Sequence, residues 1–203
     1  MHFEVLLEEE STRAAMDNLL PKMIRDEDSF NIHPFNGKKD LLGKLPGRLR
    51  AYKKWIPRDY RIVVLVDRDR DDCMVLKRQM ETIAIEAGLS TKSSSPNDDT
   101  FQVLNRIAIE ELEAWFLGDV EALAAAYPGV PLTLGAKERY RDPDAVVNAW
   151  EALERVLQQA GYPGPLQKIK SASEISKGMV PDRNRSASFQ SFYTGVLACI
   201  RQS

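Results

Sequence analysis

The segment Arg61-Ile-Val-Val-Leu-Val66 constrains the fold more than any other part of this chain. It is rich in β-branched residues and apolar at odd and even positions alike, so both faces of the strand that it predicts must be buried. A strand covered on both faces is typical of the centre of a parallel sheet with helices on either side. The acidic run Asp67-Arg-Asp-Arg-Asp-Asp72 follows at once, so charged side chains are expected where this strand ends.

Strand and helix patterns alternate on both sides of this segment. Apolar residues at helical spacing follow each predicted strand, and Gly88 marks the end of the third helix. The order β-α-β-α-β-α-β predicts an α/β fold with a mostly parallel central sheet, flanked by helices and joined by right-handed crossovers. The predicted strands are 3–7, 30–35, 61–66 and 101–109, and the predicted helices are 11–23, 41–55 with a break at Pro46, 73–87 and 110–126.

The later part of the chain contains no further strand pattern. We therefore expect an α/β core at residues 1–126 and a helical C-terminal extension at residues 127–203, packed on the core as one compact domain. The expected elements of the extension are a helix between Asp142 and Gly161 and a last helix capped by Ser186 and Ser188.

Composition excludes several classes of protein. Hydrophobic residues make up 43% and charged residues 29%, which excludes wholesale disorder. The net charge of −2 excludes a globally basic nucleic-acid coat, so any polyanion site must be local. Two cysteines without paired spacing and two histidines argue against a disulfide framework and a Cys/His zinc site. Without a membrane-spanning run or a visible secretory signal, we expect a cytoplasmic protein.

Acidic residues follow three of the predicted strands, in the runs 8–10, 67–72 and 110–113. Sites of open parallel sheets lie outside the carboxyl ends of the strands, so these side chains can share one site. Two carboxylates about 4 Å apart repel by roughly 4 kcal/mol at an effective dielectric near 20. A Mg²⁺ or Mn²⁺ ion relieves that repulsion and attracts phosphate. The predicted metal ligands are Glu8, Asp67, Asp69 and Glu113, of which the first three are also the predicted catalytic residues.

The acidic residues have other interpretations. They can be solvated loop residues, with Asp71 and Asp72 facing the N-terminus of the next helix. An EF-hand loop fails because it needs Gly at position 72 and Glu at position 78, where the chain has Asp72 and Arg78. A haloacid-dehalogenase-like phosphatase would carry its Asp-x-Asp motif after the first strand, whereas in this chain the motif follows the third predicted strand. A response-regulator receiver phosphorylated at Asp67 fits the positions of the acids but lacks the Lys-Pro pair of a late strand.

A basic segment follows the second predicted strand. Residues 38–58 include eight lysines and arginines and a single acid, Asp40. This pattern indicates either a surface that tracks phosphates, with Tyr52 or Trp55 available for stacking, or a solvated helix side. Basic residues near the end of the chain can contact a scissile phosphate or lie on the surface. The predicted nucleic-acid-binding residues are Lys38, Lys39, Lys44, Arg48, Lys53, Lys54, Lys168, Arg183 and Arg185.

The chain resembles a Toprim fold in its Glu8 after the first strand and its Asp67-Arg-Asp69 after the third. More specifically, it is similar over nearly its whole length to a bacterial domain-of-unknown-function family, number 4276, grouped with Toprim-like proteins. The segments that carry this resemblance are Val5-Leu-Leu-Glu-Glu-Glu-Ser11, Phe35-Asn-Gly-Lys-Lys-Asp-Leu41, Leu65-Val-Asp-Arg-Asp69, Ile109-Glu-Glu-Leu-Glu-Ala-Trp115 and Arg183-Asn-Arg-Ser-Ala-Ser-Phe189.

Toprim domains occur in topoisomerases, primases and nucleases, including nucleases partnered with ABC-type ATPases in phage defence. The resemblance implies a Mg²⁺- or Mn²⁺-dependent nuclease that acts on DNA or RNA, with Glu8 as acid/base or metal ligand and Asp67 and Asp69 holding the ion. The family's Glu is often followed by Gly, where this chain has Glu9. The alternatives are a catalytically weak or inactive Toprim-like module that docks a partner protein, and a receiver-like phosphorylation switch at Asp67.

Overall fold

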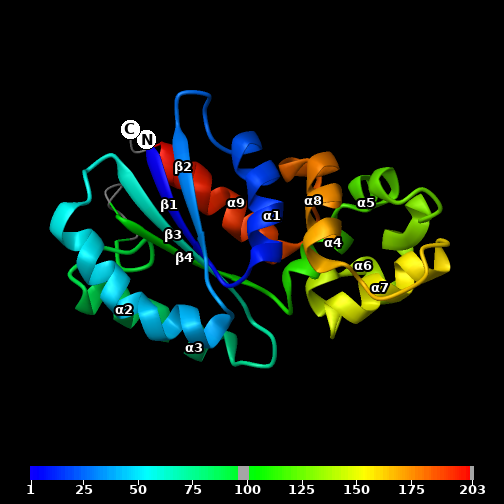
Figure 1. The fold of residues 1–203 in the computed structure, drawn as a ribbon, viewed down its shortest axis with the longest axis horizontal. Helices are drawn as coiled ribbons and strands as arrows, with labels where there is room; N and C mark the ends of the chain where they lie inside the picture. The colour runs from blue at the N-terminus through cyan, green and yellow to red at the C-terminus, as the bar shows by residue number, and fades with distance from the viewer. Residues whose placement is uncertain (96–100, 202–203) are drawn as a thin grey trace.

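The computed structural model describes residues 1–95 and 101–201, and in this part of the chain four parallel strands form one central sheet. The strand order is β2-β1-β3-β4 (Figure 1). The predicted α/β class, with a parallel sheet flanked by helices, is therefore confirmed. The strands are β1 (His2–Leu7), β2 (Ser29–Pro34), β3 (Tyr60–Asp67) and β4 (Val103–Ala108).

The order in which strands are added reverses at β1. Strand β2 pairs with one edge of β1, and β3 and then β4 extend the sheet from the other edge. Strands β1 and β3 pair in register from His2 opposite Tyr60 to Leu7 opposite Leu65. Binding sites of open parallel sheets form outside the carboxyl ends of the strands at such a reversal. Glu8 and Asp67 stand where β1 and β3 end, so both leave the sheet at this place.

Helices cover both faces of the sheet. One face is covered by α2 (Lys38–Trp55) and α3 (Cys73–Glu86), and the other by α1 (Glu10–Leu19) and α9 (Ala187–Ile200). Successive side chains of β3 point to alternate faces of the sheet. Val64 points to the face covered by α2, and Val63 points to the face covered by α1. Asp67 has the parity of Val63, so its side chain lies on the α1 side.

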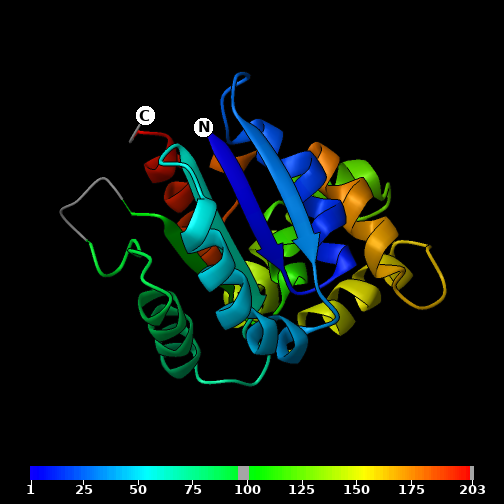
Figure 2. The same cartoon turned by 60° about the vertical axis from the view of Figure 1, so that its left-hand side comes forward.

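After β4 the described chain is helical. These helices are α4 (Leu112–Gly118), α5 (Val120–Ala126), α6 (Glu138–Arg141), α7 (Ala149–Gln159) and α8 (Lys168–Gly178), with short 3₁₀ turns between several of them. They gather beyond the carboxyl ends of the strands, with α8 beside α1 (Figures 1 and 2). Residues from both parts of the chain, among them Leu19, Trp115 and Ile175, form one continuous hydrophobic cluster. None of the described helices is both long and apolar enough to cross a membrane.

Helix α2 continues through Pro46, so the predicted break at that residue is wrong. Proline removes one N–H and displaces the carbonyl of the residue four positions earlier, which costs a helix about 3 kcal/mol. Pro46 lies away from the buried stripe of the helix, so water can satisfy the displaced carbonyl. The stripe that holds the helix together against the sheet is Leu41, Leu45, Leu49 and Tyr52.

The helix predicted between Asp142 and Gly161 is divided, which corrects that prediction. A 3₁₀ turn spans Pro143–Ala145, and α7 begins only at Ala149. Asp144, which a continuous helix would have enclosed, accepts hydrogen bonds from the Ser186 hydroxyl at 2.6 Å and the Ser188 N–H at 2.7 Å. Long-range hydrogen bonds thus override local helix propensity. Ser186 caps α9 as predicted, whereas the Ser188 hydroxyl accepts the indole N–H of Trp115 at 2.8 Å.

Candidate functional site

Two of the predicted site residues meet where the strand order reverses. The Glu8 Oε2 atom accepts a hydrogen bond from the backbone N–H of Asp67 at 3.1 Å. The parallel register that places Leu7 opposite Leu65 brings the two strand ends side by side. Burial raises the pKa of Glu8, against the opposing effect of the N–H that binds it. The topology alone therefore joins acidic residues that are 59 positions apart.

Asp67 and Glu113 are both buried, with exposed fractions of 8% and 2%. Burial raises the pKa of Asp67 well above its usual range, and the charges of Glu113 and Glu8 raise it further. Burial also raises the pKa of Glu113, in the first turn of α4, to about 7. Neither carboxylate takes part in an ion pair within the described residues. Buried carboxylates with raised pKa values favour binding a proton or a cation.

Lys168 brings a positive charge from the C-terminal part of the chain to these acids. Burial lowers the pKa of this first residue of α8, but the charges of Glu113, Glu9 and Glu111 outweigh that effect, so the pKa is raised. Its Nζ atom lies 5.7 Å from the centre of the Trp150 ring, a cation–π contact. The Glu111 carboxylate also accepts a hydrogen bond from the backbone N–H of Trp150 at 2.9 Å, so the start of α7 is bound here too. We call Glu8, Glu9, Asp67, Glu111 and Glu113 the carboxylate cluster.

Asp69 forms an ion pair with Lys38. The Lys38 Nζ atom lies 2.7 Å from Asp69 Oδ2 and 2.7 Å from Asp71 Oδ2, and it donates to the Arg68 carbonyl at 3.0 Å. Strand β3 ends at Asp67, and Asp69 has a left-handed backbone with φ of 49°. The extended backbone therefore ends before Asp69, and the side chains of Asp67 and Asp69 do not project from one side of a continuous strand. The Asp69 charge still contributes to the raised pKa of Asp67.

A hollow of about 550 Å³ opens beside the carboxylate cluster, lined by the loops after β3 and β4 and by the start of α7. Within the described chain the non-glycine residues with positive φ are Asp69, Glu110 and Asn148, and all three line this hollow. Arg68 forms an ion pair with Glu110 there. A left-handed backbone costs a non-glycine residue about 1–2 kcal/mol, and such conformations gather at functional sites. The residues with left-handed backbone and the charged side chains of Arg68 and Glu110 thus lie around the same hollow.

The donor atoms of this place suit a hard divalent cation, because Mg²⁺ and Mn²⁺ prefer carboxylate oxygens. The positions of these carboxylates differ from those of ligands in a metal-binding site. In the described residues no three His, Cys, Asp or Glu side chains come close enough together to hold a metal ion. Lys38 holds Asp69, and Lys168 provides the positive charge near the others. The predicted ligands fit such an ion by chemistry, and they would have to move to bind it.

The predicted basic residues of α2 lie on its solvent side, apart from Lys38. Tyr52 belongs to the buried side, and its hydroxyl donates to Glu4 at 2.8 Å, so the stacking role considered for Tyr52 is excluded. Trp55 has an exposed fraction of 56% and is accessible. The exposed basic residues among the predicted set are Lys39, Lys44, Arg48, Lys53 and Lys54.

Arg183 and Arg185 have partners inside the protein. The guanidinium of Arg183 contacts the buried carboxylate of Asp119 through two nitrogens, at 2.9 and 3.0 Å, and reaches Glu121 at 2.6 Å. Arg185 donates to the Gly135 carbonyl at 3.0 Å. These contacts fasten the segment before α9 to the region of α5. The structure therefore places both arginines with partners outside the carboxylate cluster.

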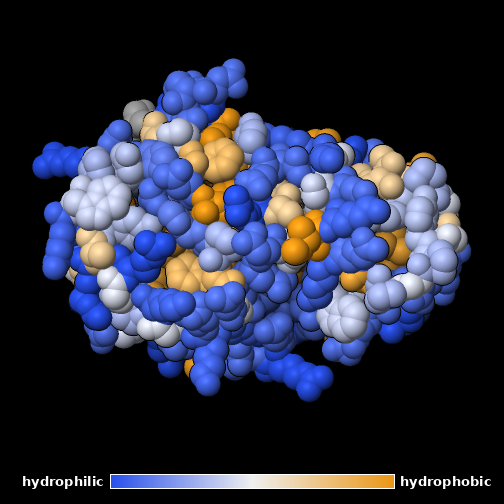
Figure 3. Space-filling model, viewed as in Figure 1, coloured by the Kyte–Doolittle hydropathy of each residue, from blue (hydrophilic) through white to orange (hydrophobic). Residues whose placement is uncertain are grey.

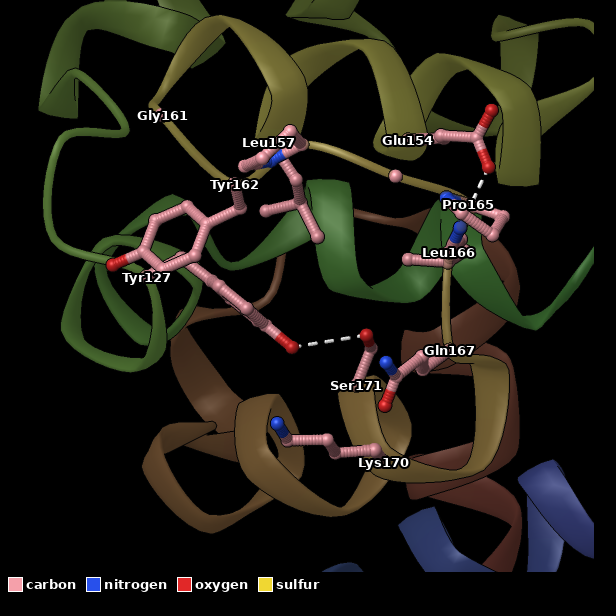
Figure 4. Close-up of a pocket in the computed structure, with 12 residues that line it drawn as sticks. Tyr127, Glu154, Leu157, Gly161, Tyr162, Pro165, Leu166, Gln167, Lys170 and Ser171 are labelled. Carbon is pink, nitrogen blue, oxygen red and sulfur yellow. Dashed lines mark hydrogen bonds between the residues drawn. The ribbon is translucent and has the colours of Figure 1, made fainter.

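A smaller hollow of about 250 Å³ lies between the end of α7 and the start of α8 (Figure 4). In this hollow the Tyr127 hydroxyl contacts the Ser171 hydroxyl at 2.9 Å, and Glu154 accepts the Leu166 N–H at 2.6 Å. The bonded groups come from the end of α5, from α7, from the segment leading into α8 and from the first turn of α8. They fix the first turn of α8, and with it the position of Lys168.

The sequence did not single out Glu111 or Trp150 as parts of the site. Glu111 resembles an ordinary helix N-terminal acid, and Trp150 sits at a periodic apolar position. Lys168 is predicted only as a nucleic-acid-binding residue, because the acids beside it in the structure are more than 50 residues away in the sequence. The one local signal that could have helped is the Glu-Glu-Leu-Glu run itself, which places acids on more than one side of a helix start.

Comparison with known proteins gives one match. A family model described as a domain of unknown function, DUF4276, matches residues 7–197. No curated protein and no solved structure matches the chain significantly. The matched range contains β3, β4, the carboxylate cluster and all of α1 to α8. The chain therefore belongs to the DUF4276 family.

Proposed function

We propose that this protein is a Toprim-like nuclease that cleaves phosphodiester bonds with the help of Mg²⁺ or Mn²⁺. The observation that carries the proposal is the burial of Asp67 and Glu113 at the reversal of strand order, beside Glu8 and near Lys168. Strongly shifted acids in such a place are typical of functional sites. The Toprim relationship, the role in bacterial defence and an ABC-type ATPase as partner rest on the sequence resemblance.

The residues of the carboxylate cluster can divide the chemistry among them. Before the ion binds, Glu113 has a pKa of about 7, so it can give up its proton near neutral pH and become an ionised ligand. The Lys168 ammonium can bind a non-bridging phosphate oxygen. A bound Mg²⁺ or Mn²⁺ ion would supply charge neutralisation and an activated water. Glu8, Asp67 and Glu113 would hold that ion, with Asp69 once Lys38 releases it.

A binding or regulatory module is the second candidate. Two observations favour it: Lys38 already neutralises Asp69, and the described residues hold no ready group of three metal-binding side chains. In this case the site would dock a partner protein without cleaving anything. A phosphorylation switch at Asp67 suits the site less. That residue is 8% exposed, and a phosphoryl group would add negative charge beside Glu8 and Glu113.

Thermal unfolding with and without Mn²⁺ tests the metal site. A ligand at about 100 times its Kd stabilises a protein by about 2.7 kcal/mol. In a chain of this size that raises the Tm by about 5–11 °C. We expect this rise in the wild type and in Asp26→Asn, a control at an exposed carboxylate, and no rise in Asp67→Asn.

Cleavage of labelled single-stranded DNA and RNA in Mn²⁺ then tests the activity. We expect Asp67→Asn and Glu8→Gln to reduce the cleavage rate at least a hundred-fold, because each removes a group from the reacting centre. A wild type that neither gains stability with Mn²⁺ nor cleaves either substrate would overturn the nuclease proposal. The binding module would then be the better description, and Asp67→Asn should still bind the partner protein.

A further inference from the structure

The solvent side of α2 carries an excess of positive charge. Its one acid, Asp40, is paired with Lys44 at 2.7 Å, and Lys38 is paired with Asp69 and Asp71. The other cations between residues 38 and 58 have no ion-pair partner within the described residues, in a protein with a net charge of −2. Such a surface is complementary to a polyanion. These cations are Lys39, Arg48, Arg50, Lys53, Lys54 and Arg58.

The middle of this side carries no side chains at Gly43 and Gly47, and we call this part of α2 the bare strip. A Cβ atom added to Gly43 or Gly47 would meet no heavy atom within 4 Å, and neither glycine has positive φ. Packing and backbone geometry therefore require neither of them, although each costs a helix about 1 kcal/mol relative to alanine. Together with Phe35 and Arg48 they line an open hollow of about 720 Å³. The face in Figure 3 is hydrophilic over most of its area, with hydrophobic residues in separate patches.

Trp55 adds an apolar ring at the end of the helix. Its side chain is 56% exposed, and its ring is held by Tyr52 and Tyr60, whose ring centres lie 5.5 and 6.2 Å away. An exposed, fixed indole among cations is suited to stacking on a nucleic-acid base. Stacking of this kind requires an unpaired base, which a duplex does not offer.

Helix α2 connects Trp55 with the candidate site. Its first residue is Lys38, which contacts Asp69, and its last is Trp55; its 18 residues span about 27 Å. Figures 1 and 2 show the helix lying along the sheet. We propose that the solvent side of α2 binds single-stranded nucleic acid, with a base on Trp55 and the phosphates along the bare strip toward the carboxylate cluster. This inference rests on the proposed function only for what happens to the strand after it is bound.

Binding is measured apart from cleavage, with the full chain carrying Asp67→Asn, in EDTA, by the fluorescence anisotropy of a labelled 12-nucleotide strand. We expect Arg48→Glu with Arg50→Glu to weaken binding at least ten-fold. Loss of two phosphate contacts lowers the slope of log K against log salt by about 1.4. Arg78→Glu with Arg155→Glu makes the same charge change at two exposed positions outside α2, and it should alter affinity less than two-fold.

The stacking part of the inference has its own variants. Trp55→Ala should weaken binding of the single strand about ten-fold, and Trp55→Phe, which keeps an aromatic ring, should restore most of it. A duplex of the same sequence should bind more weakly than the strand and respond little to Trp55→Ala. Circular dichroism verifies that each variant is folded.

Three results would overturn the inference: unchanged affinity in the α2 charge variant, a duplex bound as tightly as the strand, or binding to phosphatidylserine vesicles in place of the oligonucleotide. Strand binding without cleavage in Mn²⁺ would instead leave α2 as the binding surface and overturn the nuclease proposal. If the α2 variants still cleave and still bind the strand as tightly as the wild type, the role of α2 as the binding surface is overturned and the nuclease proposal is kept.

Discussion

Glu113 shows at the scale of one residue how the fold changes the chemistry of an acid. Its pKa of about 7, against an ordinary value of 4.5, means that the folded protein binds this proton more tightly than the unfolded chain. The resulting stabilisation is full below about pH 4.5 and is lost as the pH rises through 7. Without metal, we expect the free energy of unfolding to fall by up to about 3 kcal/mol from pH 5 to 8.

Urea unfolding across that pH range measures this effect. Glu113→Gln should remove much of the slope, because the neutral amide has no proton to lose. Glu10→Gln, at an exposed acid of α1, should leave the slope as in the wild type. The remaining slope in Glu113→Gln is assigned to Asp67, Glu8 and Glu111, whose pKa values are shifted in the same direction. A wild type whose stability is flat from pH 5 to 8 would contradict the burial of these two acids.

Lys38 decides whether Asp69 can act as a ligand. Its Nζ atom lies 2.7 Å from a carboxylate oxygen of Asp69 and 2.7 Å from one of Asp71. A divalent ion must therefore compete with Lys38 for the Asp69 carboxylate. We expect Lys38→Met to tighten Mn²⁺ binding several-fold by titration calorimetry, while stability falls by about 1 kcal/mol or less. Lys39→Met, at the exposed neighbour, is the control and should change neither. Weaker Mn²⁺ binding in Lys38→Met would show that Lys38 holds the ligands in place.

At the scale of elements, α2 contains glycines that its own stability does not require. Gly43→Ala and Gly47→Ala add a methyl group in open space at negative φ, so each should stabilise the protein by about 1 kcal/mol and raise the Tm by about 2–4 °C. Gly129→Ala should do the reverse, since Gly129 has φ of 107° and an added Cβ would lie 2.7 Å from the Ala160 carbonyl oxygen. Scanning calorimetry of the three variants checks both signs, and a lower Tm for Gly43→Ala would contradict the regular helix.

The elements that were predicted correctly differ from the others in a physical way. The four strands and the helix after β3 bury continuous or periodic apolar stripes, and such stripes are visible in the local sequence. The helix predicted over 110–126 is divided at Asp119, which ends α4 and caps α5 through the Ala122 N–H. The interrupted helix before Ala149 and the continuous helix through Pro46 depend on partners far away. Asp144 is held by Ser186 and Ser188, and α2 is held by its contact with the sheet. No local pattern reports these partners.

At the scale of the whole molecule, the C-terminal helices share a hydrophobic core with the α/β part. Ile175 in α8 is fully buried in the same cluster as Leu19 and Trp115, whereas Ile169 of the same helix is 56% exposed. We expect Ile175→Ala to lower the free energy of unfolding by about 2–5 kcal/mol in a single cooperative transition. Ile169→Ala, the matched control, should cost less than about 0.5 kcal/mol.

Parallel unfolding curves from circular dichroism and tryptophan fluorescence test this cooperativity, because Trp55 and Trp150 lie in the two predicted parts of the chain. Coinciding curves that shift together in Ile175→Ala are expected for one domain. Two separate transitions, only one of which moves in that variant, would instead support a division near residues 126 and 127.

The sequence by itself determined the α/β class, the parallel sheet and the placement of acids after the strands, because burial on both faces and strand polarity are local or topological properties. Only the tertiary structure decided which acids meet. It brought Glu8 to Asp67 across the β1–β3 pair, added Glu113 and Lys168 from later helices, and directed Asp69 to Lys38. Electrostatic interactions act over a few ångströms in space whatever the separation along the chain.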